Sequence, residues 1–226
     1  MSGRHMDARH NYNLRRTMTP KQIADMFNDF ADDYEEVYKG LGLCSHLRIG
    51  EYMAETYPEH LRAALQVLDV GAGTGYVGET LSELGFKRID ALDPAQKMLD
   101  VAKTKKVYRR LICAFLNKNR IDEIETDQYD CITAAGAFNE GLIPVSAFQE
   151  MIRIVKPGGR IIFTITDKYI ANTDGYRKEL LPFIQKMADE GAWDITAVPL
   201  ADGAIHRPDG PGMLYSFKVN VTEKHL

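Results

Sequence analysis

The stretch Leu68-Asp69-Val70-Gly71-Ala72-Gly73-Thr74-Gly75 decides the fold of this chain. It predicts a short buried strand, residues 66–70, followed at once by a glycine-rich turn and by a helix that starts near Thr74 and stops at Gly85. Glycine tolerates positive φ and leaves the backbone open to a ligand. The helix start presents free N–H groups and a positive dipole end. Such a turn, at the carboxyl end of a first strand, is typical of a site for a nucleotide-like cofactor.

The residues of the turn leave two cofactor classes open. Gly73-Thr74-Gly75-Tyr76-Val77-Gly78 satisfies the G-x-G-x-x-G pattern of dinucleotide-binding proteins, which indicates a nicotinamide or flavin cofactor. Asp69 favours S-adenosylmethionine instead, because a buried acid is costly without a cationic or hydrogen-bonding partner. The ammonium of a methionine moiety would supply that partner, whereas a pyrophosphate would be repelled. An acid that caps its own loop is the structural alternative.

A second acid, Asp93, ends the next predicted strand, residues 88–93. An acid at this place can accept hydrogen bonds from both ribose hydroxyls, so Asp93 indicates a ribose without choosing the cofactor. It also suits the N-cap of the following helix, since Pro94 fits a first helical position. Further along, Lys156-Pro157-Gly158-Gly159 marks the end of a helix before the strand 161–165.

Three segments carry a family resemblance: Val67 to Gly75, Ala91 to Leu99, and Lys156 to Gly159. Together they resemble the motifs of class I S-adenosylmethionine-dependent methyltransferases, over roughly residues 26–221. The resemblance implies an α/β, Rossmann-like fold: a seven-stranded, mostly parallel sheet with helices on both faces and a C-terminal antiparallel strand pair. It implies one domain over residues 17–226, with S-adenosyl-L-methionine as cofactor and S-adenosyl-L-homocysteine as product. The residues expected at the cofactor are Tyr34, Asp69, Gly71, Ala72, Gly73, Gly75, Asp93, Pro94, Met98, Phe115, Leu116, Ala135 and Gly136.

The segment before the first strand predicts two helices. Thr19-Pro20-Lys21-Gln22 is a capping box, and apolar residues then recur at helical spacing as far as Gly40. In class I methyltransferases an aromatic and acidic segment similar to Asp32-Asp33-Tyr34 closes over the cofactor, so the resemblance places Tyr34 in the pocket. Ser45 is expected to cap the second helix, which Pro58 stops.

Beyond the second strand, the chain alternates strands and helices, as in a parallel sheet. Met98, one turn into the helix 94–103, is expected in the core, against an adenine ring, or both. Many family members carry an acid after the third strand, predicted here at residues 110–115, but this chain has Ala114-Phe115-Leu116-Asn117. Backbone N–H groups of Phe115 or Leu116, or the side chain of Asn117, would have to reach the adenine instead.

Small residues follow the fourth predicted strand, residues 129–135, and Ala135 and Gly136 leave room for a ligand there. Helices are expected over residues 145–155 and 175–190, and the terminal strand pair over 193–199 and 213–221. Ligands bind outside the carboxyl ends of parallel strands. The predicted acceptor wall is therefore built from residues 136–144, the loop 166–174 and the connection holding His206 and Arg207. His206 is a candidate base, and a solvent-facing loop histidine is the alternative.

Composition limits the remaining possibilities. The net charge of −4 offers no general attraction for nucleic acid, and no apolar run is long enough to span a membrane. Cys44, Cys113 and Cys131 are odd in number and widely spaced, which argues against disulfides or a metal site and favours a cytoplasmic or nuclear setting. Residues 1–16 are predicted to be a disordered basic tail, with residues 1–6 an expression scar.

Three functions follow from these patterns. The first is methyl transfer to an unknown acceptor, a small molecule or a protein, with nucleic acid disfavoured. The second is a cofactor-binding protein that does not methylate and acts through partners. The third is an NAD-dependent oxidoreductase, which Asp69 disfavours.

Overall fold

The computed structural model describes residues 15, 17–42, 44–139, 141–172, 175–201 and 210–220. Within these residues the strands form a seven-stranded sheet in the order β3-β2-β1-β4-β5-β7-β6. The strands are β1 Gln66–Val70, β2 Arg88–Leu92, β3 Tyr108–Ile112, β4 Tyr129–Ala134, β5 Val155–Thr166, β6 Trp193–Leu200 and β7 Gly212–Val219. Of the predicted basic tail, only Arg15 is described, and its buried side chain donates a hydrogen bond to Asn139 Oδ1 at 3.1 Å.

The sheet is parallel from β3 to β5, and β7 pairs antiparallel with both β5 and β6. This arrangement confirms the predicted mostly parallel sheet and its terminal antiparallel pair. From β1 the chain proceeds to β2 and β3 on one side, and then returns to β4 and β5 on the other. The strand order therefore reverses between β1 and β4, and ligands of such sheets bind outside the carboxyl ends at this point.

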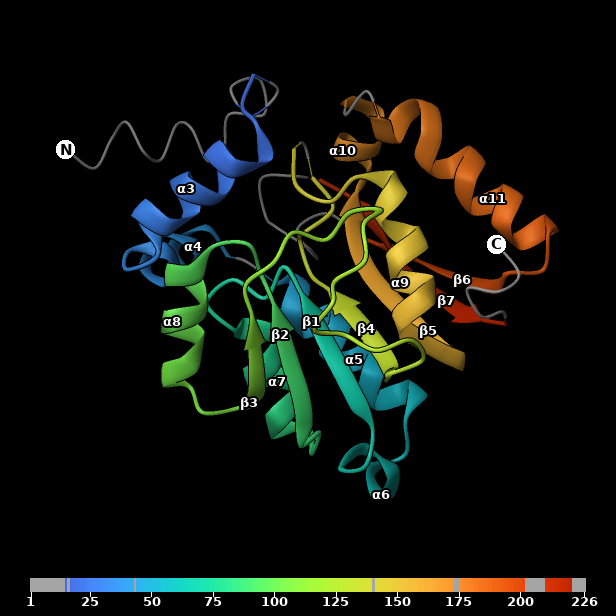
Figure 1. Cartoon of the computed structure of the whole chain (residues 1–226), viewed down its shortest axis with the longest axis horizontal. Helices are drawn as coiled ribbons and strands as arrows, with labels where there is room; N and C mark the ends of the chain where they lie inside the picture. The colour runs from blue at the N-terminus through green and yellow to red at the C-terminus, as the bar shows by residue number, and fades with distance from the viewer. Residues whose placement is uncertain are drawn as a thin grey trace.

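Helices cover both faces of the sheet (Figure 1). One core contains Ile49 of α5 and Leu81 of α7 together with Val67 of β1. The other contains Phe148 of α9 and the neighbouring strand residue Leu68, because successive side chains of a strand point to opposite faces. The helical segments are α3 Pro20–Phe30, α4 Tyr34–Leu41, α5 Ser45–Thr56, α6 Glu59–Arg62, α7 Tyr76–Glu83, α8 Gln96–Thr104, η1 Val145–Ala147, α9 Phe148–Ile154, α10 Asp167–Asn172, η2 Tyr176–Leu180 and α11 Leu181–Asp189. None of the described helices has the length and apolar character needed to cross a membrane.

The first predicted helix is in fact two. The capping box at Thr19 is present as predicted, but α3 ends at Phe30 and α4 begins at Tyr34. Adjacent aspartates occupy the turn between them, and aspartate is a poor helix former that competes for backbone hydrogen bonds. The break directs α4 away from α3 and leaves Tyr34 packed edge-on against Phe30.

Several other boundaries differ from the prediction. The third strand was expected at residues 110–115, but β3 ends at Ile112 because its parallel partner β2 ends at Leu92. The residues after Ile112 therefore leave the sheet. The predicted cap Ser45 is the first residue of α5, and Cys44 precedes it without a side-chain cap. The predicted loop 166–174 contains α10, the predicted helix 145–155 opens with the 3-10 turn η1, and the helix 175–190 opens with the π-helical turn η2.

Candidate active site

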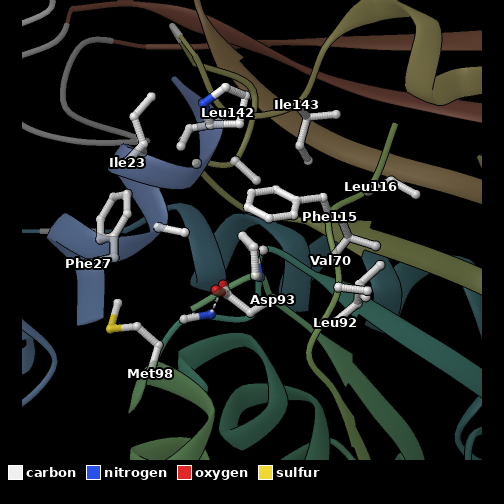
Figure 2. A pocket seen from close by; sticks show the side chains of 18 of the residues that line it. Ile23, Phe27, Val70, Leu92, Asp93, Met98, Phe115, Leu116, Leu142 and Ile143 are labelled. Atoms are coloured by element: carbon white, nitrogen blue, oxygen red, sulfur yellow. Dashed lines mark hydrogen bonds between the residues drawn. The ribbon is translucent and has the colours of Figure 1, made fainter. Parts of the chain in front are cut away.

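A pocket lies outside the carboxyl ends of β1, β2 and β4, at the reversal of strand order (Figure 2). Its walls come from α3 and the start of α4, the glycine turn after β1, the end of β2 with α8, and the segments after β3 and β4. The lining residues are Pro20, Ile23, Ala24, Phe27, Tyr34, Val70, Gly71, Gly73, Leu92, Asp93, Pro94, Met98, Ala114, Phe115, Leu116, Ala135, Gly136, Ala137, Gly141, Leu142 and Ile143.

The glycine turn supplies one wall of the pocket. Gly71 and Gly73 have φ angles of 64° and 54°, in the left-handed region that favours glycine. A Cβ on Gly71 would come within 2.7 Å of the Cβ of Ala137, and one on Gly73 would lie 3.6 Å from Met98 Cε. Because Met98 also lines the pocket, a side chain at residue 73 would occupy space that a ligand needs.

Asp93 is the one carboxylate among the described lining residues, and it is 8% exposed. Its Oδ2 accepts a hydrogen bond from Gly73 N–H at 2.9 Å, and its Oδ1 accepts one from Ala95 N–H at 2.8 Å. Burial raises the pKa of Asp93 to about 6, although these two backbone bonds lower it. A carboxylate has about four acceptor sites, so both oxygens can still accept a hydrogen bond from a ligand hydroxyl. Asp93 thus links the turn, the start of α8 and the pocket.

Asp69 is fully buried and is not among the lining residues. Its Oδ2 accepts a hydrogen bond from the hydroxyl of Tyr108 at 2.6 Å, and its Oδ1 accepts a longer one from Thr133 at 3.4 Å. Burial raises the pKa of Asp69 to about 7, and these two hydrogen bonds oppose that shift. The hydrogen-bonding partner that the sequence argument required is therefore Tyr108. That Asp69 contacts the cofactor directly stays a prediction.

Most of the predicted cofactor residues come together in the pocket. Those that line it are Tyr34, Gly71, Gly73, Asp93, Pro94, Met98, Phe115, Leu116, Ala135 and Gly136. Asp69, Ala72 and Gly75 are not part of the lining. Gly75 instead packs against Ala102 and the ring of Tyr108. Their role in binding stays a prediction.

Sequence reasoning missed the contribution of α3. The apolar residues at helical spacing after Thr19 predict a core-facing helix, but two of them, Ile23 and Phe27, line the pocket, and Figure 2 shows both side chains on the same side of it. The two residues are one helical turn apart, so their spacing predicted the inward face. Nothing in that spacing distinguishes a core from a cavity.

The predicted acceptor wall is described only in part. Within residues 136–144, Gly141, Leu142 and Ile143 line the pocket beside Gly136 and Ala137. Residues 166–172 do not. His206 and Arg207 lie outside the described residues, so the candidate base stays a prediction. In the described part of the chain, no group of His, Cys, Asp and Glu is arranged to hold a metal ion.

Comparison with known proteins identifies the class to which this fold and pocket belong. The family model of a methyltransferase domain matches residues 68–163, from the turn strand β1 into β5. A solved TehB-like S-adenosylmethionine-dependent methyltransferase from Corynebacterium glutamicum has the same fold, with a TM-score of 0.59 and 16% identity. That match covers 85% of this chain and 99% of the other. Together these matches support a class I S-adenosylmethionine-dependent methyltransferase, with S-adenosylmethionine as its cofactor.

Two proteins of known name are similar to this chain in sequence. Methyltransferase-like protein 27 of Homo sapiens is 25% identical over 173 residues, which cover 76% of this chain and 69% of that protein. A demethylmenaquinone methyltransferase of Paenarthrobacter aurescens is 28% identical over 144 residues, 63% of this chain and 54% of the relative. The chain thus spans about half the length of the second relative. The resemblance to methyltransferase-like protein 27 is also what the residues predict, from the segments 108–111, 136–141, 176–180 and 190–193.

Proposed function

We propose that this enzyme methylates a small molecule with an apolar body. The observation that carries the proposal is that the pocket has one end with a carboxylate and one apolar end. Asp93 lies at its lower end in Figure 2, whereas Ile23, Leu142 and Ile143 form an apolar upper end. Apolar pockets with a few placed polar groups are typical of small-molecule sites.

The cofactor fits the lower end. Asp93 would accept hydrogen bonds from the two ribose hydroxyls, and the missing side chain at Gly73 leaves room beside it. Met98 and Phe115 would lie against the adenine, with backbone N–H groups of Phe115 or Leu116 near its edge. When bound, S-adenosylmethionine supplies a methyl group already activated on a sulfonium. The remaining task of the chain is to align the acceptor and to exclude water, a proximity effect of about 7–11 kcal/mol at best.

The described lining holds few groups that could remove a proton. Burial raises the pKa of Tyr34 well above its ordinary value, so its hydroxyl stays protonated at neutral pH. Asp93 is engaged by two backbone N–H groups. We therefore propose an acceptor atom that is nucleophilic without a strong base, with His206 retained as the candidate base if one is used.

The demethylmenaquinone methyltransferase matched above is named for a quinone acceptor. The apolar upper end supports an acceptor of similar polarity here. We further propose that residues 17–226 form one domain and that the enzyme acts in the cytoplasm or nucleus.

The test is transfer of a tritiated methyl group from S-adenosylmethionine to a cell extract, separated into protein and low-mass fractions. We expect the label in the low-mass fraction, extractable into organic solvent. Label in the protein fraction alone would contradict the proposal and indicate a protein acceptor. Calorimetry with S-adenosylhomocysteine, run in parallel, establishes that the protein used is competent to bind its cofactor.

A further inference from the structure

The hydroxyl of Tyr108 lies between Asp69 and the first turn of α7. It donates a hydrogen bond to Asp69 Oδ2 at 2.6 Å and accepts one from Gly78 N–H at 3.1 Å. Tyr108 is the first residue of β3, two strands away from β1, which carries Asp69. One side chain therefore joins the buried acid, the helix that follows the cofactor turn, and a distant strand.

The bond to Gly78 acts as a helix cap. The first N–H groups of a helix have no partner within it, and a side chain at the N-cap usually accepts from the third residue. Here α7 begins at Tyr76, so Gly78 is that third residue, and the N-cap Gly75 has no side chain to offer. Tyr108 supplies the missing acceptor from another part of the sheet.

The ring of Tyr108 also explains two glycines. A Cβ on Gly75 would lie 3.0 Å from Tyr108 Cε2, and a Cβ on Gly78 would clash with the phenol carbon and oxygen. Gly78 completes the dinucleotide pattern in the sequence. The contact with Tyr108 accounts for it without any ligand.

We propose that Tyr108 is a positioning residue of the cofactor site. Its hydroxyl connects the carboxylate of Asp69 to the N-terminus of α7, and the negative charge held there favours a cofactor with a cationic tail at the glycine turn. A helix N-terminus by itself favours anions. A carboxylate connected to it through a hydroxyl offsets that preference and leaves a net negative charge behind the turn. The inference rests on the proposed placement of the cofactor at this turn.

The charge behind the turn depends on the protonation of Asp69. The groups that face it are Tyr108 from β3 and Thr133 from β4, with the negative charge of Asp93 nearby. Glu79 of α7 acts on Tyr108, whose own pKa burial raises well above its ordinary value, so that the hydroxyl remains a donor. Without this donor, the ionised form of Asp69 loses a hydrogen bond and its pKa rises further. Asp93 titrates as well, but the substitution leaves its own hydrogen bonds from Gly73 and Ala95 in place.

The test compares Tyr108→Phe with the matched control Tyr129→Phe. Tyr129 also donates a hydrogen bond from its hydroxyl to a buried acid, Asp90 at 2.9 Å, but it lies on β4 with no contact to the turn among its hydrogen bonds. Both variants therefore lose the same kind of interaction. The dissociation constant of S-adenosylhomocysteine is measured by calorimetry from pH 5.5 to 9 for both and for the unaltered protein.

We expect Tyr129→Phe to keep the affinity and its pH profile. Tyr108→Phe is expected to bind several-fold to about tenfold more weakly at pH 7, because Asp69 without its donor is ionised in a smaller fraction of the molecules. Its affinity should recover only at a higher pH than in the unaltered protein. An unchanged pH profile in Tyr108→Phe, or equal losses in both variants, would overturn the proposal.

Asp69→Asn provides the second arm if Tyr108→Phe does not fold. It removes the charge and keeps the size of the side chain, so binding should be weaker and should lose the part of its pH dependence that Asp69 contributes. Affinity and pH dependence equal to those of the unaltered protein would overturn the proposal. If the unaltered protein does not bind S-adenosylhomocysteine, the placement of the cofactor fails first, and the two failures are distinguished.

Discussion

The Asp93 carboxylate is expected to dominate cofactor affinity, and Asp93→Asn is the sharpest perturbation of it. Each oxygen of Asp93 accepts one backbone hydrogen bond, from Gly73 or from Ala95, and an asparagine keeps an acceptor oxygen for only one of the two. What it loses is charge and one acceptor, at the place where two ribose hydroxyls would donate. Hydrogen bonds to charged groups contribute about 1.5–3 kcal/mol each. Loss of one corresponds to a dissociation constant about 10- to 100-fold higher. Asp93→Ala removes both acceptors, about 3–6 kcal/mol, or roughly 10²- to 10⁴-fold.

Calorimetry with S-adenosylhomocysteine measures these changes directly. The titration belongs at pH 8, because the pKa of Asp93 is about 6 and the carboxylate must be ionised in the unaltered protein. Asp100→Asn is the matched control: Asp100 is an exposed acid on α8 that accepts a hydrogen bond from Gln96, so its loss should leave the affinity unchanged. An Asp93→Asn variant within twofold of the unaltered protein would refute the assignment of Asp93 to the ribose.

Three further outcomes are expected. Asp69→Asn should raise the melting temperature at pH 8 and change it little at pH 4. The reason is that the pKa of Asp69 is about 7 in the folded protein and 3.8 in the unfolded chain. The buried charge therefore costs no stability below pH 3.8 and its full free energy above pH 7. Equal changes in melting temperature at both pH values would contradict this. Gly73→Ala should cost about 1–2 kcal/mol of stability by strain at positive φ, measured by urea unfolding, and should abolish cofactor binding because its Cβ enters the pocket. Lys105→Met should increase the dissociation rate of S-adenosylhomocysteine in stopped-flow measurements. The reason is that Lys105 forms ion pairs with Glu35 of α4 and Glu79 of α7, and α4 carries the pocket residue Tyr34. An unchanged rate would show that these ion pairs do not hold α4 in place.

The parts of the site that the sequence predicts are those set by neighbours along the chain. A strand, a glycine turn and a helix start follow one another within residues 66–76, and the positive φ of such a turn already favours glycine at 71 and 73. Asp93 is similar, since it directly follows β2 and its carboxylate accepts a hydrogen bond from Ala95 at the start of α8. The mostly parallel sheet and its antiparallel end follow from the family resemblance, and the structure confirms both.

The parts that the sequence could not supply depend on contacts across long distances in the chain. The periodicity of α3 predicts that Ile23 and Phe27 face inward, but it does not show that a pocket lies there. The end of β3 depends on the length of its partner β2, and this decides that Phe115 lies outside the sheet with 41% of its surface exposed. The partner of Asp69 lies 39 residues away in Tyr108, a separation at which no local pattern operates.

The glycines of the turn show why a pattern match alone could not choose the cofactor. Gly73 faces the pocket, and Gly71 packs against Ala137, which lines it. Gly75 and Gly78 instead meet the ring of Tyr108, which is a packing requirement of the protein itself. The G-x-G-x-x-G pattern therefore combines glycines with different causes, and only the first of its three borders the ligand space. A dinucleotide interpretation treats all three as evidence for one ligand. Because Tyr108 accounts for two of them, that evidence reduces to a single position, which S-adenosylmethionine explains equally well.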